Sequence, residues 1–192
     1  MDEQNLVEQL RQGDRKAFVI LVNTFQKRLL KVAYGITLDP EESREIVQEV
    51  FIAVFRQIHS FRQEAALYTW LRKMTVNHCL NWKRRWKRRL RWHHDPIPLE
   101  NDPSLSPENT QMETPEILIQ KKQFRQQLMD AVKHLPEKTR TVFVLYALEE
   151  LSYEEIADFL QIRKGTVASR LYHARKQVAD VLNSKKTQEK PV

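Results

Sequence analysis

Apolar residues recur at the three- and four-residue spacing of an α-helix along most of this chain. The pattern becomes regular after Gly13 and Asp14, where it predicts a long helix whose apolar face consists of Phe18, Leu21, Val22, Phe25, Leu29, Val32 and Ile36. Asp39 is a capping residue and Pro40 suits the first helical position, so a second helix is expected to begin there. Its expected core stripe is Ile46, Val47, Val50, Phe51, Val54, Phe55 and Ile58.

The opposite face of this second helix carries mostly carboxylates together with one aliphatic residue. It consists of Glu41, Glu45, Gln48, Glu49 and Ile52. Single apolar residues are common on protein surfaces, so the face is either a solvated acidic surface or a surface for a partner. The spacing alone does not choose between these two interpretations.

A helix expected from about Tyr68 to Arg91 has two distinct stripes. The stripe expected in the core consists of Leu71, Met74, Thr75, His78, Cys79 and Trp82. The other stripe offers an aromatic ring, amides and cations within an arc of about 60°, because each residue turns the helix by roughly 100°. Its members are Trp70, Lys73, Asn77, Asn81, Arg84 and Arg88.

The C-terminal part is also expected to be helical. One helix is predicted from about Pro115 to His134, and a second from Pro136 to Leu148. Residues 142–146 could form a strand by propensity, but Pro136 at the start of the segment and the helical surroundings favour a helix.

A helix-turn-helix follows. Ser152 and Glu155 have the spacing of a capping box, which begins a short helix. After a turn over 161–165, a second helix is expected to bury Val167, Leu171, Ala174 and Val178. Two helices joined by a short turn, with the small Ala157 at their crossing, form the helix-turn-helix motif.

Composition narrows the function classes. The 192 residues include only 3 glycines and 8 prolines, which disfavours a glycine-rich β-sandwich or an enzyme built on phosphate-binding loops. The single cysteine, Cys79, excludes an internal disulfide and a cysteine-based zinc site. The polar start and the lack of an apolar run near the ~20 residues of a membrane span predict a cytoplasmic protein without membrane insertion.

The net charge is +7, but the distribution of charge along the chain is more informative than this total. Residues 65–94 hold nine Lys or Arg, no acidic residue and all four tryptophans, whereas 95–120 hold six acidic residues, no basic ones and five prolines. We therefore expect an all-α protein of two small helical domains, over 1–94 and 117–184. A flexible acidic linker over 95–116 is expected to join them, and 185–192 is expected to be a disordered tail.

The basic stripe and the helix-turn-helix both favour nucleic acid. A solvated basic face is the alternative for the stripe, but like charges repel along a helix, whereas rings between cations suit single-stranded nucleic acid. An acidic first helix followed by a basic second one favours DNA over an ordinary helical hairpin. The six histidines are scattered without a catalytic motif, and His93, His94 and Asp95 would point apart, so no enzyme, metal or cofactor is expected.

Four segments together resemble the extracytoplasmic-function (ECF) RNA polymerase sigma factors of the sigma-70 superfamily. Residues 42–51 resemble the family's core-binding segment, and residues 61–62, 68–71 and 76–77 resemble its promoter-melting segment. Residues 135–143 are similar to the start of its second domain, and residues 151–157 and 165–171 to its helix-turn-helix. Arg44, Ala168 and His173 depart from the residues usual in the family, so base preference is not transferable.

The resemblance implies a mechanism without catalysis, in which core polymerase and promoter DNA are the partners. The β′ clamp would bind Glu41, Glu45, Gln48, Glu49 and Ile52, while helices of the second domain hold the β flap. The separated strand of the downstream element would be captured by Phe61, Arg62, Tyr68, Trp70, Lys73, Asn77, Asn81, Arg84 and Arg88.

The second domain would read the upstream element from the major groove. The residues implied are Lys164, Thr166, Ala168, Ser169, Arg170, Tyr172, His173 and Lys176. Many relatives are held inactive by an anti-sigma factor, and the resemblance leaves such a partner open. The alternative function is a stand-alone helix-turn-helix regulator, which would bind duplex DNA without polymerase.

Overall fold

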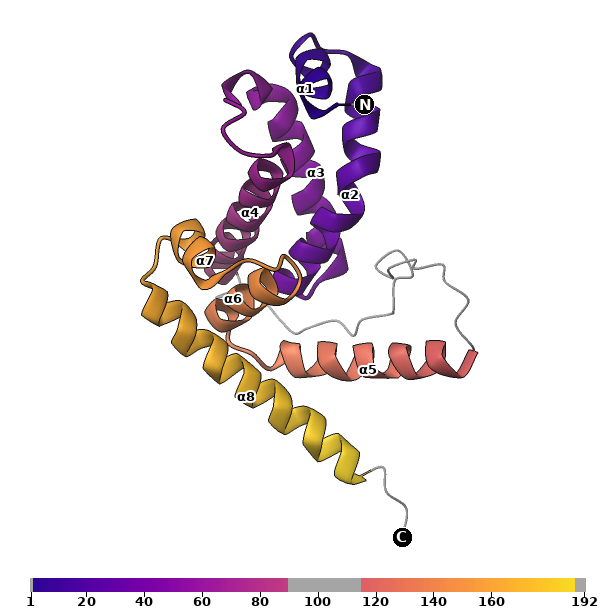
Figure 1. Ribbon diagram of the computed structural model, residues 1–192, viewed down its shortest axis with the longest axis vertical. Coiled ribbons are helices and arrows are strands. Elements are labelled where there is room, and N and C mark those ends of the chain that lie inside the picture. Colours follow the sequence, from indigo (N-terminus) through magenta and orange to yellow (C-terminus); the bar gives the residue numbers. More distant parts are fainter. Residues whose placement is uncertain (1, 90–114, 189–192) are drawn as a thin grey trace. The chain divides into compact units, whose positions relative to one another are not determined.

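A computed structural model describes residues 2–89 and 115–188, and within them it contains helices and turns but no strand. The chain divides into two compact units, Met1–Ser106 and Pro107–Val192. The expected all-α architecture is confirmed (Figure 1). All but the last two residues of the expected linker lie outside the described residues, and so does the His93–His94–Asp95 cluster at its start.

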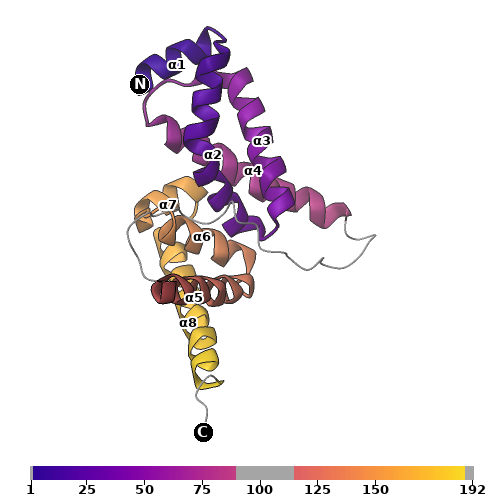
Figure 2. The same ribbon diagram turned by 90° about the vertical axis from the view of Figure 1, so that its right-hand side faces the viewer.

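The first unit is built around three long helices. These are α2 (Arg15–Thr37), α3 (Pro40–Gln57) and α4 (Leu67–Arg89), and each packs against the other two. The shorter α1 (Glu3–Arg11) lies across one end of this group, and the 3-10 turn η1 (Ile58–Ser60) ends the α3 segment (Figures 1 and 2). The core of the unit fills the space between α2, α3 and α4.

Helix α1 was not expected from the sequence. It buries Leu6, Val7 and Leu10. Gly13 then turns the chain with a φ of 77°, a conformation that glycine adopts without steric cost, and Asp14 caps α2 by accepting a hydrogen bond from the Lys16 amide at 2.7 Å. Three apolar residues within nine are too short a pattern to predict such a helix.

The start of α3 is confirmed, and its core stripe needs one correction. The Asp39 side chain accepts a hydrogen bond from the Glu42 amide at 3.0 Å, and Pro40 is the first helical residue. Six of the seven expected stripe residues are buried, but Phe55 is 60% exposed. Its ring lies edge-on to the Phe18 ring of α2, with 6.0 Å between centroids, at the edge of the stripe.

The core stripe of α4 is rotated relative to the expected one. Leu71, Thr75 and Cys79 are buried as expected, but Met74, His78 and Trp82 are only half-buried. Arg72 and Val76 are buried instead. Because α2 and α3 both cover α4, its buried face is centred between the 71–75–79 and 72–76 rows. His78 lies at the edge, where its Nδ1 is 3.2 Å from Glu49 Oε2.

The second unit is arranged around α8 (Lys164–Gln188). It packs against α5 (Pro115–Lys133), α6 (Glu137–Ala147) and α7 (Tyr153–Leu160), as Figures 1 and 2 show. Residues 142–146 are helical in α6, so the choice of helix over strand is confirmed. Helix α8 continues four residues into the segment expected to be a tail, and residues 189–192 lie outside the described part.

The ends of the helix-turn-helix and its core agree with the sequence pattern. Ser152 Oγ accepts from the Glu155 amide at 3.2 Å, and Glu155 Oε2 accepts from the Ser152 amide at 2.8 Å, which completes the capping box. Val167, Leu171, Ala174 and Val178 are all buried, as is Ala157 at the crossing. A local contact joins α6 to the preceding turn, because the buried Arg140 donates from Nη1 to the Leu135 carbonyl at 3.2 Å. Burial lowers the pKa of Arg140.

Candidate nucleic-acid and partner interfaces

The outward face of α3 combines carboxylates with an exposed aliphatic side chain. All five residues singled out on it, Glu41, Glu45, Gln48, Glu49 and Ile52, are exposed. Ile52 is 45% exposed, although the opposite stripe of the same helix is buried. Arg44 pairs with Glu41, which leaves this face acidic on balance. An acidic face with one exposed aliphatic side chain is suited to a basic partner surface that also offers an apolar contact.

The sequence led us to expect an accessible Phe61 side chain, but the side chain is buried. It is 5% exposed, and its ring stacks on Trp70 with 5.1 Å between centroids and 29° between planes. The ring is therefore not accessible in the free protein, and its expected role in capturing the separated strand stays a prediction. The stack covers one face of the Trp70 ring.

Tyr68 is also buried, against the expectation of an accessible ring. It is 8% exposed and stacks on Phe25 at 5.9 Å between centroids. The Arg28 guanidinium lies 3.7 Å from the centre of the Tyr68 ring, a cation–π contact between α2 and α4. The phenol ring thus fastens two helices, and a base could reach it only after these contacts rearrange.

The polar members of the α4 stripe lie as expected. Lys73, Asn77 and Asn81 are exposed, Trp70 is half-buried, and Arg62 is exposed in the loop before α4. Arg84 and Arg88 belong to α4, but their side chains lie outside the described residues. One face of α4 therefore brings an aromatic ring, a cation and two amides together.

Two residues of α1 that sequence reasoning missed contact the ends of this loop. Arg11 Nη2 donates to the Phe61 carbonyl at 2.7 Å, and Glu3 Oε1 accepts from the Leu67 amide at 2.8 Å. These partners are 50 and 64 residues apart in the chain. No local pattern could have indicated them.

The outward face of α8 is polar and exposed, with one large aromatic side chain. Lys164, Ser169, Tyr172, His173 and Lys176 are exposed, while Thr166, Ala168 and Arg170 are half-buried. Tyr172 is 65% exposed, and its ring meets that of His173 edge-on at 5.5 Å between centroids. All eight residues singled out lie within thirteen positions of one helix, the arrangement with which a recognition helix presents side chains to a groove.

Contacts around α8 hold this face in place. Lys164, at its first turn, pairs with Glu154 of α7, and the hydrogen bond from Lys164 lowers the pKa of Glu154. Further along, the Arg175 guanidinium lies 4.7 Å from the centre of the Tyr146 ring in α6. Arg175 and Lys176 are both exposed, but Arg175 contacts the Tyr146 ring of its own unit.

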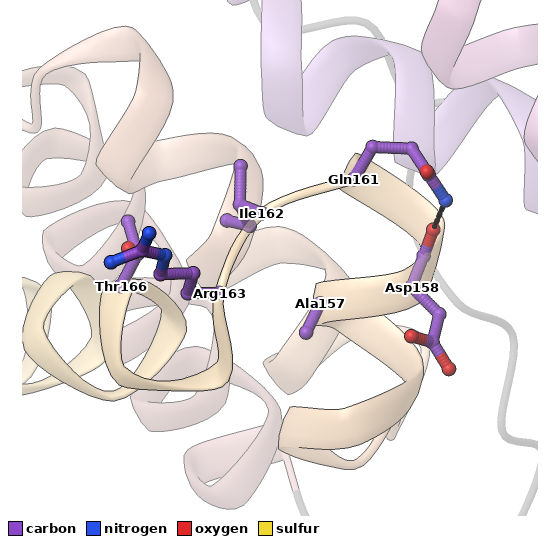
Figure 3. Close-up of a pocket in the computed structure, with 6 residues that line it drawn as sticks. All are labelled: Ala157, Asp158, Gln161, Ile162, Arg163 and Thr166. Atoms are coloured by element: carbon purple, nitrogen blue, oxygen red, sulfur yellow. Dashed lines mark hydrogen bonds between the residues drawn. The ribbon is translucent and has the colours of Figure 1, made fainter.

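The turn between α7 and α8 contains an open hollow of about 650 Å³, drawn in Figure 3. Gln161 turns the chain with a left-handed φ of 53°, and its side-chain amide donates to the Asp158 carbonyl at 2.6 Å. Arg163 and Thr166 lie together on the α8 side, while Asp158 lies on the α7 side (Figure 3). The hollow has no pair of groups arranged for acid–base chemistry and belongs to the motif's turn.

Neither a metal site nor a membrane helix is found in the parts of the chain that are described. Within residues 2–89 and 115–188, no three His, Cys, Asp or Glu side chains gather so that they could hold an ion. Over the same ranges, none of the helices has the length and apolarity needed to cross a bilayer.

Two family matches cover most of the two units. Residues 21–89 match the family Sigma-70 region 2, and residues 125–178 match Sigma-70, region 4. The chain is 35% identical over 187 residues to the ECF RNA polymerase sigma-E factor of Haemophilus influenzae, a match that covers 93% of this chain and 94% of the relative. It is 32% identical over 184 residues to the RNA polymerase sigma-H factor of Pseudomonas aeruginosa, covering 94% and 93%.

Solved structures share the fold. CnrH, solved in complex with the cytosolic domain of CnrY, superposes with a TM-score of 0.60 at 19% identity, covering 95% of this chain and 97% of that one. The sigma factor RpoE, solved with the anti-sigma factor NepR from Bartonella quintana, gives a TM-score of 0.66 at 18% identity, covering 88% and 98%.

Proposed function

The chain belongs to the extracytoplasmic-function sigma factors of the sigma-70 family, and on that premise we propose how its two units divide the work of transcription initiation. As a sigma factor, it binds core RNA polymerase and directs it to promoter DNA. In our proposal the unit over 1–94 binds the β′ clamp and opens the promoter. The unit over 117–184 binds the upstream element and the β flap, and the segment 95–116 links the two units.

The exposure pattern of α8 is the observation that carries this division. Its apolar row is buried against the second unit, and its opposite row is polar, exposed and partly basic. In the major groove, Ser169, Tyr172 and His173 would face base edges, and Ala168 could touch a thymine methyl group. Arg170 and Lys176 would contact phosphates.

The α3 face is proposed as the clamp-binding surface. Its exposed aliphatic residue, Ile52, would be desolvated at the centre of the contact, and the surrounding carboxylates would select a basic partner. The family match over 21–89 also supports this role over a stand-alone regulator, which has no need of such a region.

The exposed face of α4 and the loop before it are proposed to hold the separated strand. Only a strand out of the duplex exposes base faces for stacking, and Asn77 has the amide donor and acceptor that a single base requires. The buried rings of Phe61 and Tyr68 would support this surface from below in the free protein. Flipping a base out of the stack costs a few kcal/mol, which contacts in the pocket must offset.

The direct test is promoter-directed run-off transcription with core polymerase, combined with core pull-down. The variant Gln48→Ala with Ile52→Glu should weaken core binding roughly a hundredfold, because it places a charge at the centre of the contact. Val19→Glu is a matched control, since Val19 is a 56% exposed aliphatic residue on α2. Unchanged core affinity of the α3 variant would remove α3 from the interface. If the protein bound promoter duplex without core polymerase and gave no run-off transcript with it, the proposal would be overturned.

A further inference from the structure

We propose that α1 is a positioning element for strand capture, in which Arg11 and Glu3 hold the two ends of the 61–67 loop in its binding conformation. The inference rests on the proposed role of that loop in holding the separated strand. It assigns a task to a helix that no sequence pattern indicated and that carries none of the residues expected to touch DNA.

The two contacts form a brace across the loop. Arg11, the last residue of α1, donates to the Phe61 carbonyl at 2.7 Å, where the loop begins. Glu3, the first residue of α1, accepts from the Leu67 amide at 2.8 Å, where the loop ends and α4 begins. The two ends of one rigid helix therefore fix the two ends of one loop.

The chemistry of each contact suits this task. The Leu67 amide is among the first amides of α4, which have no acceptor within their own helix, and a carboxylate is favourable at that positive end. At the other end, Arg11 Nε is buried without a hydrogen-bond partner, an unfavourable position for a guanidinium. The fold keeps Arg11 there, next to the Phe61 carbonyl, rather than releasing it to solvent.

The loop between the tethers has the character of a binding segment. Residues 62–66 are all exposed, and Gln63 has a left-handed φ of 57°, which few residues other than glycine adopt readily. The Phe61–Trp70 stack joins the start of this loop to α4. A loop whose ends are held loses less conformational entropy when it binds, so the brace favours capture of the strand.

The test uses the full-length protein in holoenzyme. Arg11→Met removes the donor and keeps the length of the side chain, and Glu3→Leu removes the acceptor, whereas Glu3→Gln keeps a carbonyl oxygen. We expect Arg11→Met and Glu3→Leu each to reduce open-complex formation on duplex promoter roughly tenfold, with core binding and closed-complex formation unchanged. Glu3→Gln should restore most of the opening.

Two controls separate positioning from simple stability. Glu8→Gln removes the Glu8 carboxylate, 3.6 Å from Arg11 Nη1, and leaves the bond to Phe61 intact, so it should open promoters normally. Val7→Ala loosens the packing of α1 with both tethers present, and it serves as a variant of lowered thermal stability. If Val7→Ala impairs opening as strongly as Arg11→Met at equal thermal stability, α1 acts only as a part of the core, and the inference is overturned.

A variant within the loop separates this inference from the proposed function. Arg62→Ala changes the loop itself and should also reduce opening. Normal opening by Arg11→Met and Glu3→Leu overturns the role of α1. If Arg62→Ala still reduces opening in that case, the proposed role of the loop stands, and if Arg62→Ala also opens normally, that role fails too. Hydrogen exchange should also be faster at the Leu67 amide in Glu3→Leu than in Glu3→Gln.

Discussion

The two surfaces proposed to meet DNA are built in different ways. In the second unit, one row of α8 is buried and the opposite row is exposed, so the position of each side chain follows from its place on a single helix. In the first unit, the surface around the 61–67 loop is assembled from α1, α2 and α4. Its rings lie against Phe25 and Arg28 as well as against each other.

The difference matches the two forms of DNA. A duplex presents its base edges in a groove that a rigid helix can enter, so a preformed and mostly polar helix face suffices. A separated strand presents base faces, which require apolar rings, and rings left in water would be costly for the free protein. The first unit therefore keeps Phe61 and Tyr68 packed within the protein.

The largest expected effect is the difference in stability between two variants, each of which lacks one ring in one of the two regions. Phe61→Ala should lower the free energy of unfolding by about 3–5 kcal/mol, because the ring is buried and supports Trp70. Tyr172→Ala should change it little, because that ring is 65% exposed. Urea unfolding of the full chain, followed by far-UV circular dichroism, measures both, because each unit is helical. If both variants lost the same free energy of unfolding, the proposed contrast between the two regions would be wrong.

Asn77→Ala tests the proposed contact between α4 and the separated strand. We expect open-complex formation to fall by about 1–3 kcal/mol, roughly ten- to hundredfold, with core binding and closed complexes unchanged, because one base contact is lost. Permanganate reactivity of promoter thymines at limiting sigma reports opening, and a pre-melted template should rescue the variant only in part. Asn23→Ala, an exposed amide on α2, is the control. Normal reactivity in Asn77→Ala would make Asn77 a surface amide.

Two substitutions in α8 test the proposed contacts with duplex DNA. Arg170→Ala should weaken binding to all sequences alike and reduce the salt dependence of affinity by about one unit of slope, as expected for a phosphate contact. His173→Ala should instead change the preference at one or two positions of the upstream element. Binding to a set of single-base promoter variants at two salt concentrations distinguishes these outcomes. A uniform loss in both variants contradicts the assignment.

The smallest effect concerns the ion pair that joins α7 to α8. Lys164 lowers the pKa of Glu154 from its ordinary 4.5, so the pair stabilises the folded state above that pH and the contribution is lost as the pH falls below it. Glu154→Gln should lower the thermal midpoint slightly at neutral pH, and this difference should shrink as the pH falls below 4.5. Salt should also reduce it, since the pair is exposed. Glu150→Gln, also exposed, is the control. A difference that grows on acidification would refute this account.

Much of the second unit could be predicted from the sequence because its information is local. The capping box of Ser152 and Glu155 lies within four residues, and the buried row of α8 follows from the 3.6-residue period alone. The same holds for Asp39 and Pro40 at the start of α3. The roles of the exposed residues in binding polymerase and DNA remain predictions.

Except for α1, the α-helices and the exposed faces of α3 and α8 follow from the spacing of residues along the chain, because neighbours three or four residues apart meet on any helix. Packing between the helices instead sets the exposure of Phe55, the burial of Phe61 and Tyr68, and the contact of α1 with the loop before α4. These outcomes depend on which helices pack together and at what rotation. Contacts between residues 50 and 64 positions apart follow no helical period, so they exist only once the chain has folded.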